Sequence, residues 1–302
     1  MGWKMLITLI IVLAFSSMLF FYFLFPGNRI EFSMGPRNYN FSIQDYGGGM
    51  QFYPNIRYPD SEISYRIENC PLGRQDEMES AFDIIGEETI LEFYPVLSDE
   101  QISVTCDDRA IVEKNLFVAG EGGPTEIVAA TKFNVIFGGD IVLLRNSQCG
   151  KPNVAIHELL HALGFNHSSN RNNVLYPVTD CSQVIGDDVI NLINELYSFP
   201  SYPDLYFSNV TAGAEGRYLS TNITVGNIGL KNSQNADIEI YADGKLIKEL
   251  NLEPIKVGEG KIIILENLFT GKVNIQELEF VIVSSFNELE EENNKIKLKI
   301  KS

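Results

Sequence analysis

Residues 157–167 read HELLHALGFNH, and this stretch decides the fold of the domain that contains it. Two histidines, His157 and His161, stand four residues apart. Four residues advance an α-helix by about 400°, so the two imidazoles project in nearly the same direction, one turn apart. Imidazoles in that arrangement can reach one metal ion through zinc–nitrogen bonds of about 2.1 Å. We therefore expect a helix that presents a pair of metal ligands.

The rest of the stretch turns this pair into a triad. Gly164 permits the positive φ that ends a helix and turns the chain sharply, so His167 can return as a third ligand. Three protein ligands leave the fourth zinc position for water, and Glu158 is placed to take a proton from that water. The chain has three histidines, all of them in this stretch. Histidines buried for packing alone would not cluster in this way. We predict His157, His161 and His167 as ligands of one catalytic Zn²⁺ and Glu158 as the general base.

The extended pattern H-E-x-x-H-x-x-G-x-x-H resembles the metzincin metallopeptidases, and among them the matrixins. Ser168 directly follows the third histidine, residues 173–177 (NVLYP) stand where matrixins carry A-L-M-Y-P, and residues 138–140 (GGD) look like the matrixin strand entry. The resemblance covers roughly residues 56–200. It implies a zinc endopeptidase whose protein or peptide substrate is added as an extended strand to a sheet edge, which we place within residues 126–145.

Several positions depart from the matrixin pattern. Leu175 stands where the family has the methionine of its Met-turn, the apolar floor beneath the metal, and this exchange usually costs under about 1.5 kcal/mol in a core. Residues 177–179 are Pro-Val-Thr where the family often has Pro-x-Tyr, and no P-R-C-G-x-P-D segment is present. Cysteine-switch latency is therefore not implied. With no spare histidine, a second structural zinc is not expected; calcium is left open, with no site assigned.

Strand and helix patterns surround the motif. We predict, in chain order, a strand at 63–67, a helix at 75–94, a strand at 102–106, a loop at 120–123, two strands within 126–145 separated by Gly138-Gly139, and a helix at 182–197. Residues 56–200 are thus expected to form an α+β, zincin-like catalytic domain with a mixed sheet and an active-site helix.

Residues 201–302 read as an all-β, immunoglobulin-like sandwich. Turn residues separate seven β-rich segments, at 205–211, 218–228, 236–241, 246–250, 261–266, 278–285 and 295–301. Residues 203–205 (PDL), 225–229 (VGNIG) and 287–294 (NELEEENN) resemble the CARDB domain, a cell-adhesion-related sandwich of bacterial and archaeal surface proteins. The resemblance implies a spacer or a binding module. For the acidic segment 287–294 we favour a solvated turn over a calcium site.

The N-terminal residues predict attachment to a membrane. Residues 5–25 carry no charge and, as a helix, span roughly the 30 Å of a bilayer core. We favour an uncleaved transmembrane signal-anchor (1–25) over a cleaved signal peptide, whose apolar stretch is usually about 7–15 residues long. Residues 26–55 lack a helix or strand period and read as a linker. We therefore expect a single-pass protein of the cell membrane with both domains on the extracellular side, or a secreted protein if the segment is cleaved.

The cysteines and the net charge indicate the compartment of the protein and the kind of partner that it can bind. Cys70, Cys106, Cys149 and Cys181 include no C-x-x-C pair, and two disulfides are expected if this region lies outside the cytoplasm. Of the three pairings that sequence permits, we favour Cys70–Cys106 and Cys149–Cys181. The formal net charge of −17 argues against a nucleic-acid partner, which needs clustered Lys and Arg.

Two rival functions remain beside the zinc endopeptidase. The first is a surface-anchored adhesion or binding protein with a vestigial zinc domain; Leu175 favours it, but the intact Glu158 does not, because a structural zinc site has no use for a base. The second is a zinc hydrolase acting on non-peptide bonds, which leaves the matrixin-like turn unexplained. The sequence assigns no oligomeric state.

Overall fold

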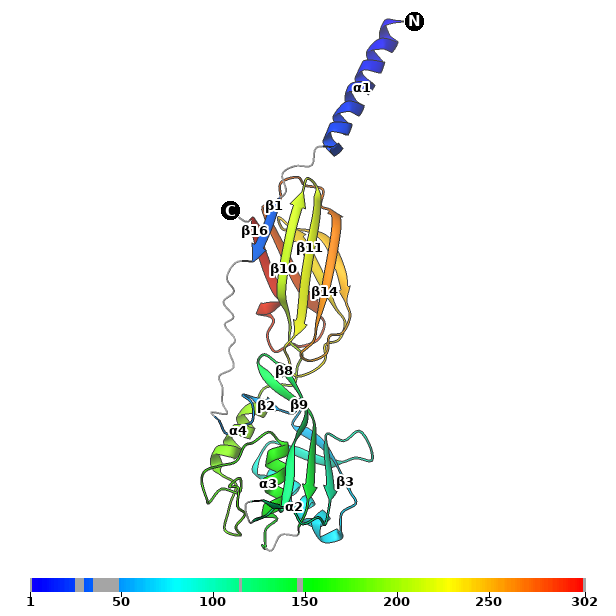
Figure 1. Ribbon diagram of the computed structural model, residues 1–302. Coiled ribbons are helices and arrows are strands. Elements are labelled where there is room, and N and C mark those ends of the chain that lie inside the picture. The colour runs from blue at the N-terminus through cyan, green and yellow to red at the C-terminus, as the bar shows by residue number, and fades with distance from the viewer. Residues whose placement is uncertain (1, 25–29, 35–48, 114–115, 146–148, 301–302) are drawn as a thin grey trace.

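The computed structural model describes residues 2–24, 30–34, 49–113, 116–145 and 149–300, which form two domains joined end to end (Figure 1). One domain combines helices with a six-stranded sheet, and the other is built on an eight-stranded sheet. The predicted α+β domain followed by a β-rich domain is confirmed.

The sheet of the first domain is mixed, as predicted. Its strands are β2 (Ile56–Arg57), β3 (Glu62–Glu68), β4 (Glu92–Pro95), β5 (Ile102–Cys106), β8 (Gly120–Ala130) and β9 (Phe133–Leu143). Their order is β2-β9-β5-β3-β4, with β8 on the other side of β9. The pairing is parallel everywhere except between β8 and β9, so β8 forms an antiparallel edge. A small pair, β6 (Val112–Glu113) and β7 (Leu116–Phe117), lies outside this sheet.

Three helices accompany this sheet: α2 (Leu72–Glu88), α3 (Asn153–Ala162) and α4 (Asp187–Tyr197). α3 packs against β8, β9 and α2, and every one of its residues is buried. Its apolar side chains fill the core of the domain, and its polar side chains, those of Asn153, His157, Glu158 and His161, are buried with them. One apolar cluster joins α3 to α2, α4 and the sheet, and α3 carries the predicted ligand motif into the middle of it.

Several element boundaries differ from the sequence prediction. The predicted helix at 75–94 ends at Glu88, because residues 92–95 pair with β3 as strand β4 instead. The helix predicted from Ser182 begins at Asp187, after Val184 has bridged to Asn173.

Glycines expected to form a loop or a break lie instead inside strands β8 and β9. A Cβ atom at Gly122 would stand 2.3 Å from the Glu158 carbonyl oxygen, and one at Gly139 would stand 2.5 Å from the Tyr58 hydroxyl. These glycines permit close packing, a role that the sequence pattern does not distinguish from a turn.

The second domain contains all seven strands predicted for it. They are β10 (Leu205–Glu215), β11 (Tyr218–Asn227), β12 (Ala236–Ala242), β13 (Lys245–Leu252), β14 (Gly260–Phe269), β15 (Glu277–Ser284) and β16 (Lys295–Ile300). A short 3₁₀ turn at Glu292–Asn294 precedes the last strand. The ring centroids of Phe207 on β10 and Phe280 on β15 lie 6.4 Å apart within one apolar core, so the two halves of the sheet face each other as a sandwich.

An eighth strand of this sandwich comes from the segment predicted as a linker. β1 (Ile30–Met34) lies between β10 and β16, antiparallel to both (Figure 1). Phe32 on β1 is 3% exposed and belongs to the sandwich core. The linker interpretation of 26–55 is therefore wrong for these five residues. Such a short segment has no period of its own, and pairing with two distant strands decides its conformation.

The N-terminal residues form helix α1 (Trp3–Leu24). Within the part of the chain that the structure describes, no helix is both long enough and apolar enough to cross a membrane. The membrane-spanning helix is thus not shown, and the signal-anchor remains a prediction.

Candidate metal centre

Two of the predicted ligands project from the buried helix α3. His157 and His161 are 7% and 6% exposed. The Nδ1 atom of His157 lies 2.6 Å from the carbonyl oxygen of Val174, and that of His161 lies 2.8 Å from the carbonyl oxygen of Phe165. A carbonyl oxygen can only accept a hydrogen bond, so each Nδ1 carries the proton. Each Nε2 atom therefore keeps its lone pair, as a metal ligand requires.

The chain after α3 turns back at Gly164 and brings the third histidine to the first two. Gly164 has a φ of +95°, which confirms the predicted left-handed turn. Its N–H donates to the His161 carbonyl, and a Cβ atom there would lie 2.6 Å from Ile56. Glycine is therefore required both for the backbone angle and for the close approach of β2. His167 follows this turn on the more exposed side of the cluster.

The three Nε2 atoms converge on one point. The Nε2 of His161 is 2.9 Å from that of His157 and 3.2 Å from that of His167, and the three ligand atoms lie within 4.8 Å of one another. Lone pairs that face each other repel unless a cation lies between them. Tetrahedral bonds of about 2.0–2.1 Å would place the nitrogens about 3.3 Å apart, close to the observed spacing.

The electrostatics of the cluster also suit a metal. Burial lowers the pKa of His157, His161 and His167, that of His161 to about 4. All three rings are thus neutral at physiological pH, which is the form that coordinates a divalent cation. The residues present fit a bound metal of the zinc type.

Glu158 lies next to the first ligand, on the side of α3 that faces β8. It is 6% exposed, and Cβ atoms built at Gly120 and Gly122 would fall within 3.0 Å of it. Burial, and then the charge of Glu121, raise the pKa of Glu158 to about 8. A cation held by the histidines would oppose both effects and favour the ionised carboxylate.

Two family models match the chain, one after the other. Residues 57–198 match the Matrixin model, and residues 202–297 match the CARDB model. The chain thus has a region similar to matrixins followed by a region similar to CARDB domains, which we call the matrixin domain and the CARDB domain. The two matched ranges correspond to the two sheets of the structure, apart from β1.

Solved structures similar to this chain include two single domains. A cell surface protein domain from Methanosarcina acetivorans, solved by NMR, is 18% identical; the match covers 33% of this chain and 93% of that chain, with a TM-score of 0.27. The CARDB domain of a Pyrococcus furiosus protein, crystallised in complex with di-metal ions, is 17% identical; the match covers 32% and 88% respectively, with a TM-score of 0.27. Comparison with curated proteins finds no match.

In the matrixin domain, the turn at the Met-turn position lies against the histidines. Leu175 is 2% exposed, its N–H donates to the Asn173 side chain, and its carbonyl accepts from the N–H of Ser168. The preceding carbonyl, of Val174, accepts from His157. The turn therefore contacts the first ligand and the residue after the third, with leucine as the buried apolar side chain.

Residues 50–52 also belong to the metal centre, although the sequence interpretation placed them in the linker. The N–H of Phe52 donates to the Gly164 carbonyl, and the N–H of Asn166 donates to the Met50 carbonyl. The Phe52 ring is stacked with the His161 ring, at 5.9 Å between centroids. A short aromatic segment of this kind shows no period that could have predicted the contact.

Both predicted disulfides are present in the matrixin domain. Cys70–Cys106 joins the start of α2 to the end of β5, and Cys149–Cys181 joins the segment before α3 to the segment before α4. The second bridge joins a residue before the histidine motif to a residue after it in the sequence. A hydrogen bond from the Asn153 side chain to the Asp180 carbonyl connects the same two segments.

In the CARDB domain, the acidic segment 287–294 is solvated only in part: Asn287, Glu291 and Glu292 are exposed as predicted, but the rest of the segment is not. Glu288, Asn293 and Asn294 are each at most 8% exposed. The Glu288 carboxylate accepts from the Leu205 N–H at 2.7 Å and from Asn294 at 2.9 Å. Within the described ranges, the histidine triad is the only group of three or more His, Cys, Asp or Glu whose ligand atoms converge, so nothing supports a calcium site.

Proposed function

We propose that the chain is a zinc-dependent endopeptidase. The observation that carries this proposal is the convergence of three imidazoles, two of them buried and that of His167 exposed, beside the buried Glu158 carboxylate, inside a matrixin domain. His157, His161 and His167 would hold the metal and leave one coordination position for water.

A zinc ion bound there would lower the pKa of its water toward about 7 and polarise the scissile carbonyl. The chain's own residues supply the remaining chemistry. Glu158 accepts the proton of the attacking water and then donates it to the leaving amine. Burial raises the pKa of Glu158, and a cation held by the histidines would oppose this shift and favour the carboxylate form, which accepts the proton. The Val174 and Phe165 carbonyls fix the ring orientations of His157 and His161.

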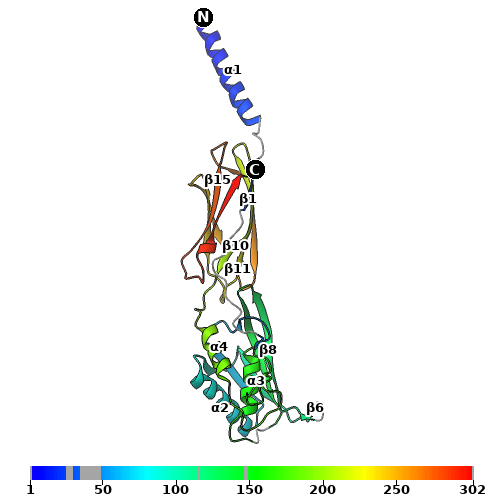
Figure 2. The ribbon, with the colours of Figure 1, turned by 90° about the vertical axis from the view of Figure 1, so that its left-hand side faces the viewer.

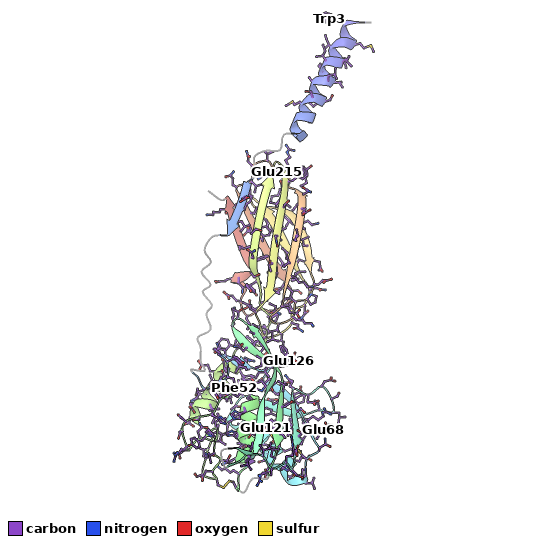
Figure 3. The ribbon with its side chains drawn as sticks, in the orientation of Figure 1. Trp3, Phe52, Glu68, Glu121, Glu126 and Glu215 are labelled. Atoms are coloured by element: carbon purple, nitrogen blue, oxygen red, sulfur yellow. A yellow bond between two sulfur atoms is a disulfide. The ribbon has the colours of Figure 1, made fainter. Side chains whose placement is uncertain are left out.

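The substrate in this proposal is an extended polypeptide that adds as a strand to β8. Among the described residues, β8 pairs with β9 alone, so its outer side offers unpaired backbone groups. This edge begins at Gly120, before the range 126–145 in which we expected it. Figure 3 shows Glu121 and Glu126 at successive heights along β8, with Glu126 nearer the CARDB domain.

We further propose that both domains act outside the cytoplasm. The two disulfides support this location, because such bonds persist in oxidising compartments. In cells expressing the full chain, a membrane-impermeant thiol reagent should label cysteines only after external reduction. Labelling only after the cells are opened would contradict the proposal.

The catalytic proposal is tested with the purified full chain, an unstructured protein substrate and zinc. Glu158→Gln should retain zinc while hydrolysis falls at least about 100-fold, because a positioned base contributes that much or more. Glu87→Gln, an exposed substitution on α2, is the matched control and should hydrolyse at the wild-type rate.

Three outcomes separate the candidate functions. Undiminished turnover by Glu158→Gln would reject the base assignment. Zinc binding without hydrolysis of any peptide by the wild type would favour the adhesion protein with a vestigial site. Absence of zinc from the folded wild type would end the metallopeptidase proposal.

A further inference from the structure

The hairpin of β8 and β9 extends from the metal centre into the CARDB domain. At the start of β8, a Cβ atom on Gly120 would lie 2.9 Å from the Glu158 Oε1 atom, so the strand is tight against the catalytic helix. Figures 1 and 2 show the other end of the hairpin reaching the base of the sandwich. The edge that would bind substrate is therefore held at both ends, by different domains.

Lys132, at the tip of this hairpin, is buried between two carboxylates of the CARDB domain. Its Nζ lies 2.6 Å from Asp204 Oδ2 and 2.8 Å from Glu290 Oε2. The three side chains are 8%, 0% and 9% exposed. Thr131, the preceding residue, has a φ of +59°, so the turn adopts a left-handed conformation to place the lysine.

The CARDB domain fixes the carboxylate that receives Lys132. The second oxygen of Asp204 accepts from the Asn293 side chain at 2.7 Å, and the Asp204 N–H donates to the Asn227 side chain. Asp204 is thus oriented by its own domain, and the ammonium group comes from the other. Ion pairs that are buried and oriented in this way hold two elements in one geometry more strictly than apolar contact does.

Apolar contact surrounds this ion pair. Ala130 and Phe133, on either side of the turn, form one buried cluster with Leu230 and Val257 of the CARDB domain. A Cβ atom at Gly258 would stand 2.4 Å from the Val128 side chain, so the sandwich lies directly on the end of β8. The order of the chain adds to this coupling, because the matrixin domain is inserted between β1 and β10, two paired strands of the sandwich.

We propose that Lys132 is a positioning residue through which the CARDB domain holds strand β8 in place for substrate. This inference rests on the proposed endopeptidase function. Without the ammonium group, the buried carboxylates of Asp204 and Glu290 would lose the cation that lies between them. The hairpin tip would then move away from the CARDB domain. β8 would then lose its fixed distance from Glu158, and a polypeptide would bind the edge less well.

The test compares Lys132→Met, Lys132→Arg and a matched control in the full chain. Lys132→Met should lower kcat/KM for an unstructured protein by about tenfold or more, chiefly through KM, because a small misplacement of a binding strand costs that much. Lys132→Arg should recover most of the loss, since guanidinium can donate to both carboxylates. The control is Lys231→Met, which breaks an interdomain pair with Asp60 that is 46% and 41% exposed, and should change kcat/KM less than about twofold.

Amide hydrogen exchange tests the role of Lys132 without relying on enzymatic activity. In Lys132→Met, the amides of β8 and β9 should exchange at least about tenfold faster, while α3 protection and zinc content stay at wild-type values. Adding Glu290→Gln to Lys132→Met should restore part of the protection, because one uncompensated charge is removed. Unchanged β8 protection and unchanged KM in Lys132→Met would overturn the proposal. If the wild type hydrolyses nothing, the endopeptidase proposal fails by itself, and the exchange data still decide the role of Lys132.

Discussion

Two buried polar clusters in this chain differ in where their cation comes from. The histidine cluster brings three neutral imidazoles together and contains no positive charge of its own, so it needs a metal ion. The cluster at the domain junction brings Asp204 and Glu290 together and receives the ammonium group of Lys132 from the other domain. A cluster whose cation is a metal ion from solution can exchange that ion. A cluster whose cation is a side chain of the same protein holds two domains together permanently. The first arrangement suits chemistry and the second suits assembly.

Removing one partner of the junction cluster should have the largest effect on stability. Burial raises the pKa of Asp204 even though Lys132 opposes the shift, so the carboxylate depends on that lysine to remain charged. Asp204→Ala leaves Lys132 half-compensated and should lower the free energy of unfolding by up to about 5 kcal/mol. Urea denaturation measures this loss. Asp60→Ala, which breaks the exposed interdomain pair, should cost under about 1 kcal/mol; equal losses in the two variants would remove the distinction between buried and exposed pairs.

The histidine cluster should respond to metal, and the junction should not. Zinc at a thousandfold excess over its Kd should stabilise the matrixin domain by about 4 kcal/mol relative to the chelated chain. Thermal unfolding with zinc and with chelator gives this difference. His167→Ala should reduce it strongly, whereas Lys132→Met should leave the zinc-dependent shift intact. A zinc effect that vanished in Lys132→Met would mean that the two clusters are not independent.

Alkaline pH should lower the free energy of unfolding of the matrixin domain through Tyr197. The histidines are already neutral and should keep that charge state. Burial raises the pKa of Tyr197 to about 12, against the opposing charge of Arg57, whose guanidinium lies 4.3 Å from the ring centroid. Because the folded-state pKa lies above the unfolded value of 10.0, stability is intact below pH 10 and is lost as pH rises through 12.

Tyr197 is expected to contribute a loss on the order of 2–3 kcal/mol, at about 1.4 kcal/mol per pH unit. Burial also raises the pKa of Tyr58, which adds to the decline, and lowers the pKa of Arg57 to about 10, which opposes it. Unfolding free energies measured between pH 9 and 12 test this decline. Tyr197→Phe should make it shallower, because the hydroxyl of this side chain is gone; a decline as steep as in the wild type would assign it to other groups.

The smallest effect is expected at the floor of the metal centre. Leu175→Met restores the residue typical of the family at a position that is 2% exposed. Exchanges between these two side chains cost under about 1.5 kcal/mol in most cores, so stability and zinc content should stay close to wild type. Thermal unfolding and metal analysis measure both. A large gain in zinc affinity would show instead that leucine impairs the site.

The two clusters also differ in how far sequence could predict them. The histidine cluster arises from eleven consecutive residues, and helical geometry with one glycine turn brings them together, so the convergence of His157, His161 and His167 could be predicted in advance. At the domain junction, Lys132 contacts Asp204 and Glu290, which lie far from it in the sequence. From the sequence we assigned no role to Lys132, and we interpreted the acidic stretch that contains Glu290 as solvated. Neither residue type nor spacing reveals such a pair, because the fold alone brings its members together.

Sequence by itself determined the helix that carries the histidine motif, the turn at Gly164 and the seven strands of the sandwich. These features depend on local backbone preference or on alternation of apolar residues. For the cysteines, sequence left three pairings open, and the structure agrees with the one that we favoured. Only the tertiary structure decided that β1 completes the sandwich, that the glycines of β8 and β9 are packing positions, and that Lys132 lies in a buried ion pair. In each of these cases the free energy comes from contacts between distant parts of the chain, which leave no period in the sequence.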